Sequence, residues 1–244
     1  MNYYLDTEFV ESPIQPKFLG VNIGKTIFTI DLISIGIVSE DDREYYAISS
    51  EFDVDNAWNK INPTTHSNEK PYYWIRENVL KPIYDELFFK AGVDRSFPHK
   101  SPVFHNPKFT LKNFKILLKK YGKSRKKIAY EISRFVCDAD NSLYSKWQDS
   151  MNNYAALLRD YKTEDNVKFY GYYADYDWVV FCWLYGRMMD LPKSFPWLCH
   201  DLQQMLDDVG SPNIQHIKDM NKNEHNALAD AKFNKNLHDY INKL

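Results

Sequence analysis

Residues 2–10 read NYYLDTEFV, and this stretch decides the fold, because its aromatic and β-branched residues predict a strand that carries acids. Side chains alternate along a strand, so Asp6 and Glu8 point to one face while Thr7 points to the other. Two carboxylates on one face repel each other unless a hard cation lies between them. A solvated polar face would explain the pair equally well if it stood alone. The stretch therefore predicts a strand with a candidate cation site.

A third acid lies far along the chain. Asp177 follows a strand predicted at 167–173 and comes just before the apolar run 178–184, which predicts a buried helix. An acid in the first turn of a helix also complements the helix dipole. Asp177 alone is therefore compatible with a helix start as well as with a metal ligand.

The sharpest motif is HNALAD, residues 225–230, at the start of a final helix predicted over 226–244. His225 falls at the helix entrance and Asp230 in its body. The alanines around Asp230 would let the helix approach a sheet closely. Together with the earlier acids, this gives four carboxylates and one imidazole. A two-metal nuclease uses these groups to bind cations and to take a proton from the attacking water.

These motifs resemble the DEDDh family of 3′–5′ exonucleases, which has an RNase H-like fold. The resemblance is carried by Asp-Thr-Glu near the start, Tyr-Asp before a late helix and His-x4-Asp near the end. Within the family, the chain resembles the adenylate-preferring exoribonucleases of the mycobacterial type (RNase AS). That likeness extends to DLISIGIV (31–38), REYYAIS (43–49), WIRENVL (74–80) and YDWVVFC (176–182). It covers the two ends of the chain better than the middle.

The resemblance implies a fold and a metal site. The fold is α/β, a single RNase H-like domain over residues 1–244 with a mixed central sheet flanked by helices. Asp6 would bridge two Mg²⁺ or Mn²⁺ ions, Glu8 and Asp230 would complete the site of one ion, and Asp177 would hold the other. His225 would be the general base, since imidazole titrates near neutral pH.

The resemblance also implies a substrate. Single-stranded RNA would be degraded from its 3′ end to nucleoside 5′-monophosphates, with adenylate preferred, by a homodimer. In the family, the backbone at the position of Thr7 grips the terminal ribose. An apolar side chain nearby wedges against the last base, and Phe9 is the candidate for that role.

The middle of the chain has a polarised charge. Residues 95–130 contain 11 Lys or Arg and no Asp or Glu. The rest of the chain has 20 basic and 33 acidic residues, although the net charge of the whole chain is only −2. We interpret the segment as an insertion that tracks phosphates, with Lys119, Lys120, Lys126 and Lys127 as the candidate contacts. Its aromatic residues would either stack on bases or form an apolar helical stripe that packs on the core.

Composition sets the remaining expectations. With 244 residues, 44% of them hydrophobic, the chain can bury one sizeable core. Its three cysteines form no CxxC motif and suit a reducing cytoplasm. Adjacent residues point in different directions, so Cys199, His200 and Asp201 are not expected to form a catalytic triad. The start of the chain lacks a signal-peptide pattern and no apolar run reaches membrane-span length, so we expect a soluble protein with no membrane partner.

Other functions stay open. The same five residues would serve a 3′–5′ exonuclease acting on single-stranded DNA or on short oligonucleotides. A catalytically silent nucleic-acid-binding module on the same fold is the alternative from another class, and a structural protein with accidental motifs is a third. The presence of all five groups favours an enzyme.

The expected elements complete the prediction. Strands at 27–38 and 44–50 would form a hairpin. Helices are expected at 72–87, with a bend at Pro82, and at 125–136, 143–161 and 201–209.

Overall fold

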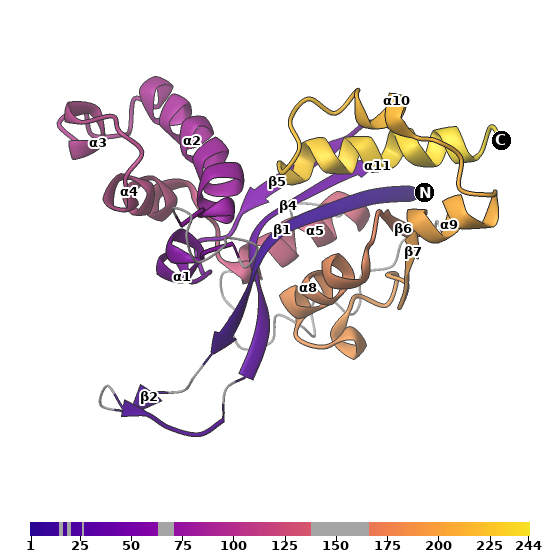
Figure 1. The fold of residues 1–244 in the computed structure, drawn as a ribbon, viewed down its shortest axis with the longest axis horizontal. Coiled ribbons are helices and arrows are strands. Elements are labelled where there is room, and N and C mark those ends of the chain that lie inside the picture. Colours follow the sequence, from indigo (N-terminus) through magenta and orange to yellow (C-terminus); the bar gives the residue numbers. More distant parts are fainter. Residues whose placement is uncertain (15–16, 19–20, 26, 63–70, 138–165) are drawn as a thin grey trace. The chain divides into compact units, whose positions relative to one another are not determined.

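The computed structural model describes residues 1–14, 17–18, 21–25, 27–62, 71–137 and 166–244 (Figure 1). These residues form two compact units. Unit 1 comprises Met1–Thr7, Ser34–Ala47 and Lys123–Leu244, and unit 2 comprises Glu8–Ile33 and Ile48–Gly122. The expectation of one domain over 1–244 stays a prediction.

The centre of the fold is a mixed five-stranded sheet with the order β5-β4-β1-β6-β7. Its strands are β1 (Asn2–Ile14), β4 (Ile27–Ser39), β5 (Glu44–Ile48), β6 (Lys168–Gly171) and β7 (Cys199–Asp201). β1 runs parallel to β6, with Tyr4 opposite Tyr170, and β6 runs parallel to β7. Two short strands, β2 (Lys17–Phe18) and β3 (Val21–Asn22), pair with each other outside this sheet.

Helices connect and cover the strands. Unit 2 holds α1 (Val54–Asn59), the π-helical turn η1 (Arg76–Leu80), α2 (Lys81–Val93), α3 (Pro102–His105) and α4 (Leu111–Tyr121). Unit 1 holds α5 (Arg125–Cys137), α8 (Asp175–Tyr185), the short 3₁₀ turn η2 (Met188–Asp190), α9 (Leu202–Asp208), α10 (Gln215–Lys218) and α11 (Ala227–Ile241).

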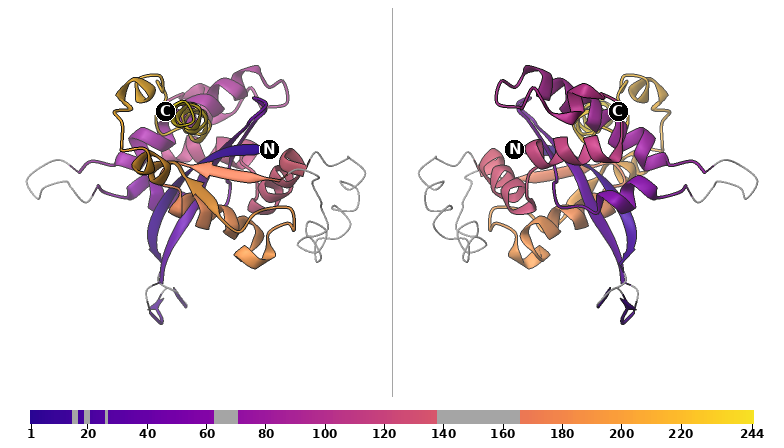
Figure 2. Two further views of the ribbon diagram at one scale, coloured as in Figure 1. Left: turned by 90° about the vertical axis from the view of Figure 1, so that its right-hand side faces the viewer. Right: turned by 90° about the vertical axis from the view of Figure 1, so that its left-hand side faces the viewer.

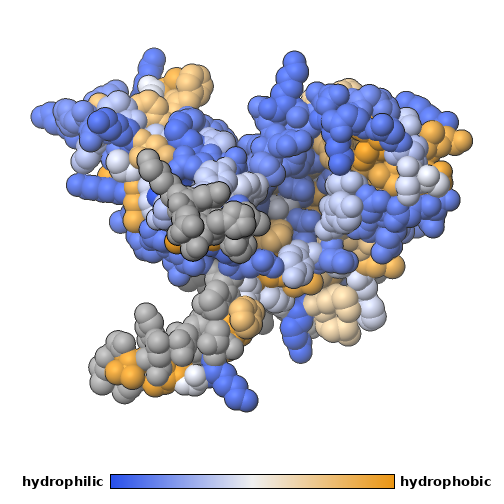
Figure 3. All heavy atoms as spheres, viewed as in Figure 1, coloured by the Kyte–Doolittle hydropathy of each residue, from blue (hydrophilic) through white to orange (hydrophobic). Residues whose placement is uncertain are grey.

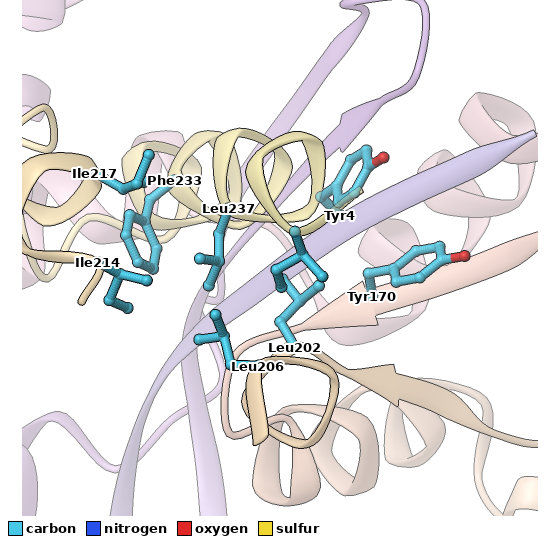
Figure 4. Close-up of a cluster of buried hydrophobic side chains, with 9 residues drawn as sticks. Tyr4, Tyr170, Leu202, Leu206, Ile214, Ile217, Phe233 and Leu237 are labelled. Atoms are coloured by element: carbon cyan, nitrogen blue, oxygen red, sulfur yellow. The ribbon is translucent and has the colours of Figure 1, made fainter. Parts of the chain in front are cut away.

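In unit 1, α11 covers one face of the sheet (Figure 2). Tyr4 and Tyr170 turn to this face and belong to a buried cluster with residues of α9, α10 and α11. Figure 4 shows Phe233 and Leu237 of α11 pointing into this cluster toward Ile214 and Leu206. Burial of such apolar surface is the main force that holds the helix on the sheet.

Helices α5 and α8 pack on the opposite face. The neighbouring side chains Tyr3 and Phe169 turn to this side, as the alternation along a strand requires. The ring of Tyr3 lies 5.9 Å from that of Phe135 in α5, and the ring of Phe169 lies 5.1 Å from that of Phe181 in α8. Unit 1 is therefore a three-layer α/β arrangement, which agrees with the predicted fold class.

Most predicted elements are present with shifted ends. The first strand runs on to Ile14, and the predicted bend at Pro82 appears as η1 immediately before α2, which continues to Val93. A π-helical turn accommodates a proline whose ring would otherwise meet the preceding turn. The strand predicted at 167–173 is confirmed as β6, although it is shorter. The helix predicted at 143–161 lies outside the described residues.

The basic segment folds as α3, α4 and the start of α5. Phe114 is fully buried in α4, and the Phe109 ring lies 4.6 Å from Trp58. The lysines of α4 are exposed, and hydrophilic side chains cover most of the surface over α2 to α4 on the face drawn in Figure 3. The aromatic residues therefore follow the packing interpretation rather than the base-stacking one. Whether the segment is an insertion stays a prediction.

Among the described helices, none combines the length and the apolar composition needed to cross a bilayer.

We expect Phe114→Ala to lower the free energy of unfolding by about 3–5 kcal/mol, because it leaves a cavity in a packed aromatic cluster. Lys112→Ala on the exposed side of the same helix is the control, and its effect should stay within about 0.5 kcal/mol. Chemical denaturation measures both values. Equal effects of the two substitutions would contradict the packing of α4 through Phe114.

Candidate functional site

The candidate site lies beyond the carboxyl end of β6, at the point where β1 stops pairing with that strand. β1 pairs with β6 only from Asn2 to Tyr4, and Asp6 follows two residues later. Asp177 lies in the first turn of α8, which begins after the end of β6. Ligands of open α/β sheets bind beyond these strand ends, because loops and helix starts converge there.

Three carboxylates from two distant parts of the sequence meet here. Asp6 and Glu8 on β1 and Asp230 on α11 each place an oxygen within 4.8 Å of the others, and all three are half-buried. The alternation of β1 explains the first two, because Asp6 and Glu8 share the face that Tyr4 presents to α11. The predicted close approach of the last helix to the sheet supplies the third.

The chemistry of this cluster suits a hard divalent cation. Its donors are carboxylate oxygens, which are the ligands that Mg²⁺ and Mn²⁺ prefer, and it contains no thiolate or imidazole. Three acids at this spacing repel one another, and a bound cation would remove that repulsion.

Asp177 is not one of these three carboxylates, and Thr7 holds its side chain. Its side chain is only 6% exposed, and its Oδ1 accepts hydrogen bonds from the Thr7 N–H at 2.9 Å and from the Thr7 hydroxyl. Thr7 can do this because it points to the face of β1 on which α8 packs. The helix-start interpretation of Asp177 is therefore incomplete, since its carboxylate turns inward to the strand.

Asp230 is held by its own neighbourhood. Its Oδ2 accepts a hydrogen bond from the His225 N–H at 2.9 Å, and its Oδ1 accepts one from the Asn221 amide. Asn226 caps the helix, with its side chain accepting from the N–H groups of Leu228 and Ala229. The contribution of Asn221 escaped the sequence analysis, because a lone asparagine in a loop carries no pattern.

His225 has an unusual backbone. Its φ of 67° lies in the left-handed region, and its N–H points back to Asp230. Histidine is among the residues that tolerate this region best outside glycine. The turn places His225 at the entrance of α11, as predicted, and the electrostatic influence of its ring lowers the pKa of Asp230.

Burial raises the pKa of both Asp177 and Asp230. For Asp177, removal from water raises the pKa to about 6, although the two hydrogen bonds from Thr7 act in the opposite direction. For Asp230, burial also raises the pKa, and the bonds from Asn221 and His225 offset part of the effect. The site thus holds carboxylates that are costly to ionise without a positive charge nearby.

The predicted substrate contacts are less clearly arranged. Thr7 uses its N–H and hydroxyl to hold Asp177, so these groups already have partners. Phe9 lines a cavity of about 190 Å³ in unit 2 together with Lys60, Ile61 and Trp74. It lies on the face of β1 opposite to Asp6 and Glu8. Its role as a wedge stays a prediction.

The four candidate lysines do not belong to one element. Lys119 and Lys120 end α4 in unit 2, where the Lys120 ammonium donates to the Ser96 hydroxyl at 3.1 Å. Lys126 and Lys127 lie in the first turn of α5 in unit 1. A common role in binding phosphates stays a prediction.

Cys199, His200 and Asp201 have structural roles in β7. The Asp201 carboxylate caps α9 and accepts the Ala174 N–H at 2.7 Å. The His200 ring stacks on Tyr170, with centroids 4.9 Å apart. These contacts agree with the expectation that the three residues form no triad.

Comparison with known proteins identifies relatives. Residues 117–242, more than half of the chain, match the family described as "3'-5' exoribonuclease Rv2179c-like domain". Two relatives from Mycobacterium tuberculosis, named 3'-5' exoribonuclease Rv2179c (strain ATCC 25618 / H37Rv) and 3'-5' exoribonuclease MT2234.1 (strain CDC 1551 / Oshkosh), are each 26% identical over 232 residues. The alignment covers 95% of this chain and 88% of each relative.

We expect Asp177→Asn to raise the melting temperature of the metal-free protein at pH 7.5. A carboxyl whose pKa is higher in the folded than in the unfolded state costs stability when it is ionised, here by about 3 kcal/mol. That cost is full above a pH of about 6 and disappears as the pH falls toward the unfolded pKa near 3.8. The amide keeps an oxygen for Thr7.

Thermal unfolding in EDTA between pH 4.5 and 7.5 measures this effect. The advantage of the variant over the wild-type protein should shrink as the pH falls. An advantage that stays constant across this range would contradict a raised pKa at Asp177.

Proposed function

The chain belongs to the Rv2179c-like 3′–5′ exoribonuclease domain family, and on this basis we propose that it hydrolyses single-stranded RNA from the 3′ end to nucleoside 5′-monophosphates. We further propose that it does so with two divalent cations, Mg²⁺ or Mn²⁺, as a member of the DEDDh group. Preference for adenylate is part of the same proposal, since it follows from the resemblance to the RNase AS subfamily.

One observation carries the proposal. Asp6, Glu8 and Asp230 offer three carboxylate oxygens within 4.8 Å of one another, just past the point where β1 stops pairing with β6. Such a group has no structural need to form, because the acids repel one another and two of them lie on a strand that could present neutral residues. A phosphodiester hydrolase has a reason to keep it.

Each of the five candidate residues has its own proposed role in hydrolysis. Asp6, Glu8 and Asp230 would hold one cation, and Asp6 with Asp177 would hold the second. Bound cations of this kind activate water as a nucleophile and stabilise charge on the phosphate. His225 would take the proton of the attacking water and return it to solvent, from its place at the entrance of α11.

A candidate base-binding cavity lies within unit 2. The cavity lined by Phe9, Ile61 and Trp74 is mostly apolar, and its lining also includes polar groups, among them Asn62. Sites of this composition suit a flat base. We propose Phe9 as the side chain that contacts the terminal base and Thr7 as part of the ribose contact. The homodimer implied by the resemblance stays a prediction.

We expect Asp6→Ala to abolish cleavage and to weaken Mn²⁺ binding strongly, because Asp6 belongs to the carboxylate cluster and is the proposed bridging ligand. The measurement is a time course with 5′-labelled oligomers of A, C and U and a matched single-stranded DNA. A ladder that shortens from the 3′ end only with Mg²⁺ or Mn²⁺, fastest on A, is the expected result for the wild-type protein.

Asp208→Ala is the control for this experiment, because Asp208 is an exposed acid in α9 outside the cluster. Cleavage by Asp6→Ala in the presence of EDTA would exclude the two-cation mechanism. A ladder on DNA but not on RNA would keep the mechanism and replace the substrate. Binding without cleavage on every oligomer would favour the nucleic-acid-binding module.

We expect His225→Asn to lower kcat by about 10²–10⁴-fold with Mn²⁺ binding retained, because it removes a general base and no cation ligand. Asparagine is chosen because it tolerates the left-handed backbone at this position. His99→Asn, at an exposed position in unit 2, should behave as the wild-type protein. Loss of Mn²⁺ binding in His225→Asn would instead assign His225 as a ligand.

A further inference from the structure

The first turn of α11 touches the backbone of the sheet at Gly36. A Cβ atom built on Gly36 of β4 would lie 2.3 Å from the carbonyl oxygen of Ala227 and 2.4 Å from both the Ala227 carbonyl carbon and the Leu228 nitrogen. All three atoms belong to the helix backbone, so no side-chain movement could relieve the overlap. Any residue other than glycine would push the start of α11 away from β4.

A second contact ties the same helix to β1. The Asn234 side chain is 1% exposed, and its amide donates a hydrogen bond to the carbonyl oxygen of Leu5 at 2.8 Å. Leu5 immediately precedes Asp6. Asn234 lies four residues after Asp230, so both side chains occupy one face of α11. The bond therefore fixes α11 against β1 next to the carboxylates that must meet.

The hydrogen bonds of Asp230 itself cannot fix α11 against β1. Its partners Asn221 and His225 lie in the segment that leads into α11, so they orient the carboxylate relative to its own helix start. Only contacts between the helix and the strands can set the distance from Asp230 to Asp6. Gly36 and Asn234 supply two such contacts, one at the helix start and one about two turns later.

We propose that Gly36 and Asn234 are the positioning residues of the cation site, and that they set its affinity by holding Asp230 at ligand distance from Asp6 and Glu8. This inference rests on the proposed function, since it assumes that the three carboxylates bind a cation. Mg²⁺ and Mn²⁺ demand near-octahedral geometry, so a small displacement of one ligand costs affinity. Substitution of supporting residues around metal sites lowers affinity by about 10–100-fold.

The experiment compares Mn²⁺ binding in the full chain with Gly36→Ala and Asn234→Leu. Electron paramagnetic resonance or calorimetry gives the Mn²⁺ affinity, and thermal unfolding in EDTA gives the stability of each variant. We expect each substitution to weaken Mn²⁺ binding by about 10-fold or more. We also expect kcat to fall while KM for RNA changes little, because the proposed RNA contacts Thr7 and Phe9 lie on neither α11 nor β4. Adding Ala227→Gly should not rescue Gly36→Ala, because the blocking atoms are backbone atoms.

Two controls separate positioning from loss of stability. Gly92→Ala, where an added Cβ meets no atom within 4 Å, should keep wild-type Mn²⁺ affinity. Leu237→Ala removes a buried side chain from the later part of α11 and should lower the melting temperature while keeping Mn²⁺ affinity. If Gly36→Ala fails to fold, Asn234→Leu decides the question alone.

The outcomes distinguish this inference from the function on which it rests. Wild-type affinity in a folded Asn234→Leu variant, with normal binding by the wild-type protein, would overturn the positioning role and leave the cation site intact. An affinity loss in Leu237→Ala equal to that in Asn234→Leu would also overturn it, because general destabilisation would then explain both. A wild-type protein that binds no Mn²⁺ would overturn the proposed function and this inference together.

Discussion

The alternation of side chains along β1 is the constraint on which the site depends. Tyr4 and Asp6 share the face that meets α11, whereas Thr7 turns to the face on which α8 packs. One strand therefore supplies two acids to the carboxylate cluster and, between them in sequence, the donor that holds Asp177. A shift of one residue in the register of β1 would exchange the two faces and dismantle both arrangements. The buried aromatic residues of β1 make such a shift costly, because they would leave their clusters.

The packing of α11 provides the second support. Half-buried acids that repel one another lower the stability of the folded protein in the absence of a cation, and burial raises the pKa of Asp230. The apolar cluster of α9, α10, α11 and the sheet offsets this cost in the overall free energy of folding, with Leu237 and Leu202 fully buried. Functional sites commonly carry such a local cost, which the surrounding structure supports. The left-handed backbone of His225 is a further part of that cost.

In the basic segment, residues 95–130, the aromatic residues and the lysines have different surroundings. Its aromatic residues pack inside unit 2, where Phe97 stacks on Tyr121 with ring centroids 5.9 Å apart and Phe114 lies in the core. Its lysines remain on the surface, and some make ordinary ion pairs, such as Lys115 with Asp55 at 2.6 Å. An exposed pair of this kind adds little stability. The phosphate-binding role of these lysines stays a prediction, while the stacking function suggested by the same sequence is not needed to explain the aromatic residues.

The sequence by itself determined what depends on local periodicity. The shared face of Asp6 and Glu8 and the helix that carries Asp230 follow from periods of 2 and 3.6 residues, and the strand and helix boundaries were misplaced by only a few residues at most ends. Tertiary structure alone decided the contacts between distant segments. Thr7 meets Asp177 across 170 residues, and Asn234 meets Leu5 across 229. No periodic pattern in the sequence predicts either pair. A hydrogen bond between two such residues depends on how the layers pack and not on the sequence neighbours of either residue. The need for glycine at position 36 has the same origin, since it arises only where the start of α11 lies against β4.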